Sequence, residues 1–389
     1  MPELVRRSRL LVTYNGVDIS EDVSSHIVAF SFIERAKHGE SDELNITFQN
    51  VPQLWSNGWF PERGATLTAK LLVENWYQPG DSFTLDCGQF EIDDLTDSGP
   101  PSLFAIGALS VGVTSKIRGD IQTRAWENIR LSEIVQQIAQ KHGFTVYFDS
   151  DYDPIFDRFD QKKQSDLAFI LKIAEYAGLQ VRLSHGKLIV YQDSLYDKQP
   201  IALTLQKNYD GVSFYQFRAS SSDVYTACQV KYLDTKSQKL LTYQYTPEGR
   251  SGTIERESVT SSGATSAVKI DPVTRMVIPA KTTQKAQKQE DDGIPLPAVG
   301  KVLNVHRRCG SLAEAETLAK SMLRNQNRRE LTGSLSLMGN LALRAGMVTA
   351  VRDFGRWDAA SYVIDEVSHS WSKSEGLRTE VSLRGVMGY

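Results

Sequence analysis

The chain has 389 residues and a formal net charge of −3 at pH 7, with 41% hydrophobic and 23% charged residues. This composition is typical of globular proteins, and the lack of a basic excess argues against a protein that binds nucleic acid mainly through its phosphates. A chain of this length is expected to fold into about two to four domains.

Cysteine content and the N-terminal sequence favour a protein that folds in a reducing compartment. Cys87, Cys228 and Cys309 lie far apart in the sequence. No two of them have metal-ligand spacing, and an odd number gives no disulfide framework. The N-terminus lacks the pattern of a signal peptide, and no run approaches the roughly 18 apolar residues of a membrane span. We therefore expect a protein made in the cytoplasm, without a membrane span.

Residues 1–117 contain short strand-like stretches separated by Gly, Pro and Asn. One stretch is broken at Asn15-Gly16, a strong signal for a hairpin turn. Short strands of this kind are typical of a barrel or sandwich, and we predict a first β-barrel domain here. Trp55, Trp59 and Phe60 are interpreted as a turn anchored by packed aromatic rings. A sugar-binding platform made of these rings is the alternative.

Residues 118–200 are predicted to form a small α/β module. Leu131, Ile134 and Ile138 have helical spacing, and Gly143 is a natural C-terminal stop for the helix.

A second helix of this module is expected after Ser165, whose side chain can cap it by accepting a backbone N–H bond. Gly178 would stop that helix. A hairpin that turns at His185-Gly186 follows, because apolar residues alternate on both sides of these two residues.

Residues 201–389 are predicted to form a second β-barrel domain that contains one helix. A polar stretch at about 246–299 interrupts it and has few large apolar residues. Such a stretch buries too little apolar surface to order itself alone, and we interpret it as a loop or arm. Ser311 and Glu314 form a capping box at the start of the helix. The expected fold class is mainly β with α+β parts: two β-barrel-like tube domains with the α/β module between them.

Charged and titratable residues have structural interpretations in this chain. Arg324, Arg328 and Arg329 are interpreted as the C-terminal end of a helix, where positive charge complements the helix dipole. His369 lies on the same strand face as Val367 and Trp371 and is interpreted as a packed core histidine. His185 is interpreted as a solvated residue at the tip of a hairpin.

Motifs that carry chemistry are missing from the sequence. It has no nucleophile elbow, P-loop, dinucleotide-binding glycine motif or zinc-protease motif. One acidic stretch matches the spacing of a calcium loop at five positions: Asp149, Asp151, Asp153, Asp157 and Asp160. Pro154 stands where that loop needs glycine, so an acidic surface loop is favoured and calcium binding is the alternative. We therefore assign no catalytic, cofactor-binding or metal-binding residue and expect a protein that is not an enzyme.

The order of the parts resembles the late control protein D family, the central baseplate hub of contractile phage tails and related injection machines. Four stretches carry this resemblance: "GQFEIDDLTDSGPPSLFAIGALSV", "LSEIVQQIAQKHGF", "QKKQSDLAFILKIAEYAGLQVRLSHGKLIVY" and the tail that begins "AETLAKSMLRNQNRRELTGSLSLMGN". Each motif alone is weakly specific, and the ordered combination is much more so.

The resemblance implies a structural hub located in the virion tail baseplate and assembled in the host cytoplasm. It implies a homotrimeric ring in which each subunit contributes two similar barrels, so that the ring has near-sixfold symmetry. The implied partners are a hexameric tail tube, a trimeric spike and the baseplate wedge proteins. DNA would pass through the lumen without specific binding. A cell-wall binding or hydrolysing protein is the alternative from another class, and a nucleic-acid-binding protein is the third.

Overall fold

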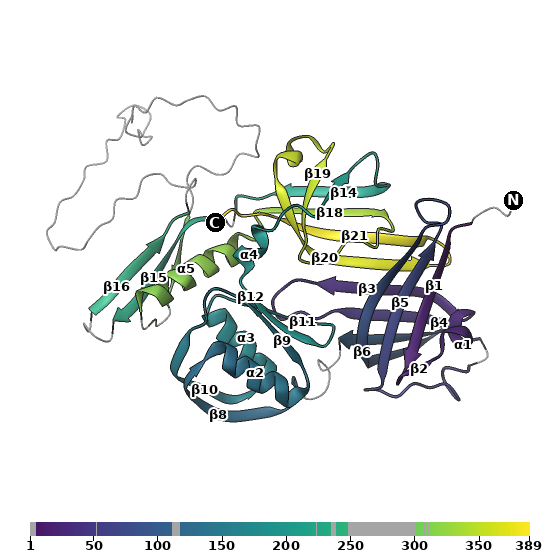
Figure 1. Ribbon diagram of the computed structural model, residues 1–389, viewed down its shortest axis with the longest axis horizontal. Helices are drawn as coiled ribbons and strands as arrows, with labels where there is room; N and C mark the ends of the chain where they lie inside the picture. The colour runs from purple at the N-terminus through teal and green to yellow at the C-terminus, as the bar shows by residue number, and fades with distance from the viewer. Residues whose placement is uncertain are drawn as a thin grey trace.

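The computed structural model describes residues 5–51, 53–110, 117–222, 224–234, 239–247, 301–306, 309 and 311–389. Strands predominate in this part of the chain, and helices are few (Figure 1). The expectation of a mainly β fold with α+β parts is therefore confirmed. The predicted polar loop or arm at 246–299 lies outside the described residues from residue 248 onward.

The N-terminal region is a curled antiparallel sheet with one small helix, and its turn at Asn15 and Gly16 is confirmed because both residues have positive φ. Its elements are β1 (Arg7–Tyr14), β2 (Val17–Asp18), α1 (Ser20–Ser24), β3 (Ile27–Arg35), β4 (Glu43–Gln49), β5 (Thr66–Glu74), β6 (Ser82–Ser98) and β7 (Leu103–Ser110). Strands β1 and β5 cross β3 and β4 at a steep angle, so the sheet encloses its own core (Figure 1).

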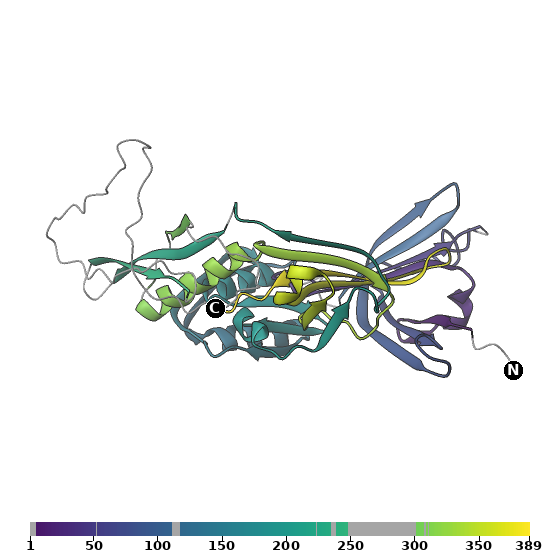
Figure 2. The same ribbon diagram turned by 90° about the horizontal axis from the view of Figure 1, so that it is seen from above.

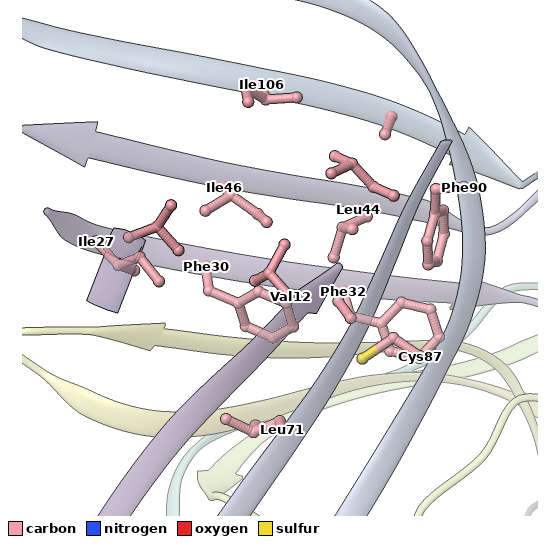
Figure 3. Close-up of a cluster of buried hydrophobic side chains, with 14 of the residues drawn as sticks. Val12, Ile27, Phe30, Phe32, Leu44, Ile46, Leu71, Cys87, Phe90 and Ile106 are labelled. Atoms are coloured by element: carbon pink, nitrogen blue, oxygen red, sulfur yellow. The ribbon is translucent and has the colours of Figure 1, made fainter. Parts of the chain in front are cut away.

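Alternating apolar residues fill this first core from both sides. Phe30, Phe32 and Phe90 point into the same space as Cys87 and Leu71, as Figure 3 shows. Each of these side chains is almost fully buried, and burial of a large apolar side chain stabilises the fold by about 1.5–3 kcal/mol. The alternation of apolar residues along the strands therefore provides the core around which this sheet curls.

The central unit packs two helices on two small sheets, and its helix signals are confirmed. Its elements are β8 (Ile121–Arg130), α2 (Leu131–His142), β9 (Thr145–Asp149), β10 (Ile155–Ser165), α3 (Asp166–Tyr176), β11 (Gln180–Ser184), β12 (Lys187–Tyr191) and α4 (Asp193–Asp197). The Ser165 hydroxyl accepts a bond from the backbone N–H of Ala168 at 3.3 Å. Gly143 and Gly178 follow α2 and α3 with φ of +77° and +74°, the left-handed conformation that ends a helix.

The remaining strands form two groups. One is a satellite sheet covered by a long helix: β15 (Tyr225–Asp234), β16 (Lys239–Tyr245), β17 (Lys301–Val305) and α5 (Leu312–Asn327). The other is the C-terminal region: β13 (Leu203–Gln206), β14 (Val212–Ala219), β18 (Leu331–Met338), β19 (Val348–Arg352), a 3-10 helix (Gly355–Ala359), β20 (Ser361–Ser372) and β21 (Gly376–Gly385). Both views place the satellite at the end of the molecule opposite β1 and β2 (Figure 1 and Figure 2).

The N-terminal and C-terminal regions share one continuous 13-stranded sheet. Its central path runs β14-β18-β21-β20-β3-β4-β7-β6, and every neighbouring pair on this path is antiparallel. The two regions join where the second half of β20 pairs with β3, from Glu366 opposite Arg35 to Ser372 opposite Ala29. Figure 1 shows β14, β18, β21, β20 and β3 stacked one below another.

The eight strands of this path are two copies of the same four-strand arrangement. Strands β3, β4, β7 and β6 match β14, β18, β21 and β20 in order, pairing and register. The register shifts also match: β6 shifts between Ile92 and Asp94 against β7, and β20 shifts between Ile364 and Glu366 against β21. The sequences at these shifts, IDDLTDS (92–98) and IDEVSHS (364–370), are similar. The N-terminal and C-terminal regions are therefore an internal repeat.

Candidate functional site

One face of the continuous sheet is made mostly of small polar side chains. The opposite face supplies the cores, where Phe30, Phe32 and Leu335 are buried. Residues that alternate with these point away from the cores and are mostly half-buried: Ser31, Asn45, Thr47, Ala105, Gly107, Ser334, Ser336, Ser368, Ser370 and Ser382. They come from six neighbouring strands of both repeats and lie opposite one another, as Ser31 does with Asn45 and Ser370.

Hydroxyl and amide groups on such a face give it a limited chemistry. They hydrate well, but they provide no row of cations for a polyanion and no large apolar area for a membrane. Charged side chains are few on this face. At one end of the strands, Arg35 pairs with Glu43 at 3.0 Å and with Glu366 at 3.1 Å. Glu380 and Arg378 of β21 also lie on this face, opposite Ser368 and Ser370. The face is therefore suited to contact with water or with a passing polymer rather than to catalysis.

A second feature is a buried ion cluster that joins the C-terminal strands to α4 and α5. The guanidinium of Arg384, with 1% of its side chain exposed, contacts Asp193 at 2.9 Å, Asp197 at 3.0 Å and Asp365 at 3.1 Å. Arg324 contacts Asp193 at 3.2 Å and Asp197 at 2.6 Å. Charges this deeply buried are stable only when they are paired.

Arginines also set the ionisation of this cluster. Burial by itself would raise the pKa of Asp193, but Arg384, Arg328 and Arg324 more than offset burial, so the pKa lies below its ordinary value. The sequence interpretation of Arg324 and Arg328 is corrected here. Both lie at the C-terminal end of α5, but their side chains pair with buried carboxylates instead of serving only the helix dipole.

The central unit is attached to the N-terminal region along the edge of β11. The turn at residues 36–42 runs beside this edge, with the N–H of Gly39 bonded to the carbonyl of Val181 at 2.8 Å. The Nδ1 of His38 accepts from the N–H of Val181 at 3.0 Å. The Tyr191 hydroxyl donates to the carbonyl of Ala36 at 2.6 Å. These backbone bonds hold the unit firmly on the end of the sheet.

The two histidines that the sequence singled out lie in the environments expected of them. His369 is fully buried, with Thr379 Oγ1 at 3.1 Å and the Leu343 carbonyl at 3.3 Å from its ring nitrogens, so a packed core histidine is confirmed. His185 lies at a hairpin tip and is exposed, so the expectation of a solvated turn residue is confirmed. Its ring packs on Gly88 of β6, because a Cβ added to that glycine would lie 2.7 Å from the ring.

The aromatic turn is largely a packed structure. Trp55 is 5% exposed and stacks on Phe48 and Phe104. Trp59 and Phe60 are more exposed and close over the edge of the first core. Packing therefore explains Trp55. The turn does not present a flat row of exposed rings that could bind a sugar.

The acidic stretch at residues 149–160 forms a shorter loop than the sequence suggested. Residues from Ile155 onward form β10, which pairs with β8, and a strand there disrupts the calcium-loop geometry. Asp153 instead caps α2 by accepting from the Ser132 backbone N–H at 3.0 Å. In the described part of the chain, no three His, Cys, Asp or Glu side chains are grouped as a metal ion would need.

Comparison with known proteins relates this chain to the baseplate hub proteins of phages. No protein-family model matches the chain. The chain is 25% identical over 391 residues to the probable baseplate hub protein of Escherichia phage 186, covering 97% of this chain and 93% of that protein. It is 26% identical over 231 residues to the probable baseplate hub protein of Escherichia phage P2, covering 57% of this chain and 55% of that protein. The chain resembles phage baseplate hub proteins along nearly its whole length.

Two solved structures share the fold of this chain. A tail protein from Neisseria meningitidis MC58 has a TM-score of 0.62 at 11% identity and covers 97% of this chain and 96% of its own. The 43 kDa tail protein of prophage MuSo2 from Shewanella oneidensis has a TM-score of 0.61 at 12% identity, covering 97% and 98%. The resemblance expected from the sequence is confirmed, and the relatives indicate a hub component of the virion tail baseplate. None of the described helices has the length and apolar character of a membrane span.

Proposed function

We propose that this chain is the structural, non-catalytic hub of a contractile tail baseplate and works as a homotrimeric ring. Each subunit would contribute two β-barrel domains, residues 1–117 and 201–389, with residues 118–200 outside the ring. Three subunits then present six similar barrels, which suit a hexameric tail tube on one side and a trimeric spike on the other. Wedge proteins would contact the outside.

The observation that carries this proposal is the internal repeat within one sheet. Strands β3, β4, β7 and β6 repeat as β14, β18, β21 and β20, and the two sets join through β20 and β3. Three identical subunits, each with two equivalent halves, would form a ring with near-sixfold symmetry.

The polar face of the sheet supports a lumen for DNA. Serine, threonine and asparagine side chains such as Ser31, Thr47 and Ser334 remain hydrated. Phosphates bind proteins chiefly through lysine and arginine, and these are sparse at the centre of this face. DNA would therefore pass along it without being held.

Electron microscopy of the purified chain, together with its mass in solution, tests the hub. Rings with a central hole at three times 43.5 kDa are expected, alone or after addition of the spike protein. Particles that stay monomeric in the presence of the spike would overturn the proposal.

A further inference from the structure

One end of the N-terminal region holds a cavity of about 450 Å³, a volume within the usual range for a bound ligand or anchoring side chain. Its wall comes from β1, α1, β4, β5, β7 and the turn at residues 55–61. The central unit is attached at the opposite ends of β3 and β4, through the turn at residues 36–42, and Figure 1 shows α1 and β2 on the side away from it. The central unit therefore leaves this part of the surface free.

The wall of the cavity is largely aromatic and held in place. Trp55 stacks on Phe48 with ring centroids 3.9 Å apart, and Trp59 meets Trp55 edge-on at 5.5 Å. The backbone N–H of Trp55 donates to the Asn50 Oδ1 at 3.1 Å, and that of Trp59 donates to the Leu54 carbonyl at 2.8 Å. Because packing and backbone bonds fix these rings, an occupant would pay little to order them.

A single charged side chain stands in this wall. Asp22 of α1 is the only charged residue that lines the cavity, and within the described chain its side chain has no hydrogen bond or ion pair. Trp59 and Phe60 line the cavity and are partly exposed, by 40% and 57%. The faces of aromatic rings attract cations. This combination selects a positive charge carried on an apolar stem.

We propose that this cavity, the Trp59 pocket (bounded by Asp22, Trp55, Trp59 and Phe60), binds an arginine side chain of another baseplate protein. The inference rests on the proposed function, which supplies the kind of partner. Arginine fits better than lysine, because its planar guanidinium stacks on aromatic rings and pairs with a carboxylate through two N–H groups. Arginine is also enriched among the residues that anchor protein interfaces.

The surroundings of the pocket favour a protein over a free small molecule. Val17, which lies opposite Tyr14 in the β1–β2 hairpin, and Val51, just before the aromatic turn, are both well exposed. A pocket beside exposed apolar residues is typical of a protein interface. The Nε1 of Trp55 is buried and has no acceptor within the described chain. A peptide carbonyl seated against this wall would supply that acceptor.

Small probes on the purified chain test the pocket. Butylguanidinium has the charge and the stem of an arginine side chain, and butylurea is a neutral molecule of nearly the same shape. In saturation-transfer NMR titrations, butylguanidinium should bind about fivefold more tightly, the effect expected of an exposed ion pair. Equal binding of the two probes, or no saturable binding of either, would overturn the proposal.

Two neighbouring carboxylates on α1 provide matched variants. Asp22→Asn should abolish the preference for butylguanidinium, because it removes the charge from the wall. Glu21→Gln should keep the preference, since Glu21 is exposed on the same helix but does not line the pocket. Equal losses in the two variants would mean that the probe responds to the general charge of α1, and the pocket would be overturned.

A third probe separates arginine from lysine. Butylammonium should bind more weakly than butylguanidinium, because its compact charge is strongly hydrated and does not stack. Trp59→Leu should remove most of this difference, since it keeps the site apolar and deletes the ring. Tighter binding of butylammonium would overturn the assignment to arginine.

Assembled baseplates test the source of the side chain. A photoreactive p-benzoylphenylalanine at position 59 should cross-link, on illumination, to an arginine-containing segment of another protein. Cross-links only to copies of this chain, or none at all, would overturn the partner.

Failure of this inference is distinguishable from failure of the hub, because the probe titrations require no ring. Rings of trimeric mass whose subunits do not bind butylguanidinium would overturn the pocket and leave the hub intact. A chain that binds the probe through Asp22 but stays monomeric with the spike present would overturn the hub and, with it, a baseplate protein as the partner.

Discussion

Arg384 is the centre of the buried ion cluster and the residue whose loss should matter most for stability. We expect Arg384→Ala to lower the free energy of unfolding by about 3–5 kcal/mol, because it leaves Asp193 and Asp197 buried with too little positive charge. Urea unfolding of the purified chain measures this change.

A matched control lies on the same strand. Arg378 pairs with Glu375, and both side chains are well exposed, so Arg378→Ala should change the free energy of unfolding by less than about 1 kcal/mol. Equal effects of the two substitutions would show that the cluster is not what holds α4 to the C-terminal strands.

His369 should make stability depend on pH. Burial, with a smaller effect of Arg344, lowers its pKa from 6.5 to about 4. Between these values the unfolded chain binds the proton and the folded chain does not. The free energy of unfolding therefore falls as pH falls from 6.5 towards 4, by up to about 3 kcal/mol.

The measurement is urea unfolding from pH 7.5 to 4.5 for the natural chain and for His369→Gln. Other groups titrate in both proteins, so the difference between the two curves isolates His369. The difference should grow in favour of the variant as pH falls. Parallel curves would contradict a neutral buried imidazole.

Elements whose ends depend on local chemistry were predictable from the sequence. Ser165 and Ser311 accept the backbone bonds expected of helix caps, and Gly143 ends α2 as expected. Each of these interactions involves residues no more than four positions apart. The repeat of IDDLTDS at 92–98 as IDEVSHS at 364–370 was also visible in the sequence, and comparing the chain with itself would have found it.

The contact between β6 and the β11–β12 hairpin gives a prediction at this scale. Gly88 has φ of +91°, and an added Cβ would lie 2.7 Å from the His185 ring. Gly88→Ala should therefore cost about 1–3 kcal/mol from backbone strain, plus the cost of moving the ring. Thermal unfolding measures the total.

Two further variants separate the cost of backbone strain from the cost of moving the His185 ring. Gly16 has a similar φ of +82° and open space around its Cβ position, so Gly16→Ala reports backbone strain alone. Adding His185→Ala to Gly88→Ala should recover the part caused by the ring. Strict additivity of the two changes would contradict the contact.

For the whole molecule, the scarcity of lysine and arginine on the polar sheet face predicts how the assembled protein treats DNA. Ser31→Lys with Ser334→Lys adds two positive charges to this face in each subunit. Assembled rings of this variant should bind short linear DNA duplexes in a salt-dependent way, whereas the natural rings should not. A gel shift at physiological salt measures the difference.

Its control adds the same charge elsewhere. Gln136→Lys with Gln140→Lys places two lysines on the exposed side of α2, away from the polar face. Equal DNA binding by both variants would mean that the sheet face does not line the path of the DNA.

Local patterns in the sequence were enough to predict most of the strands and helices, because caps, turns and the alternation of apolar residues act between near neighbours. The sequence also indicated the hub resemblance through the order of its parts. The contact of Arg384 with Asp197, 187 positions away, and the pairing of β3 with β20 became visible only in the folded chain. Ion pairs and strand pairings of this kind depend on which distant segments the fold brings together, and no local pattern of residues records that choice.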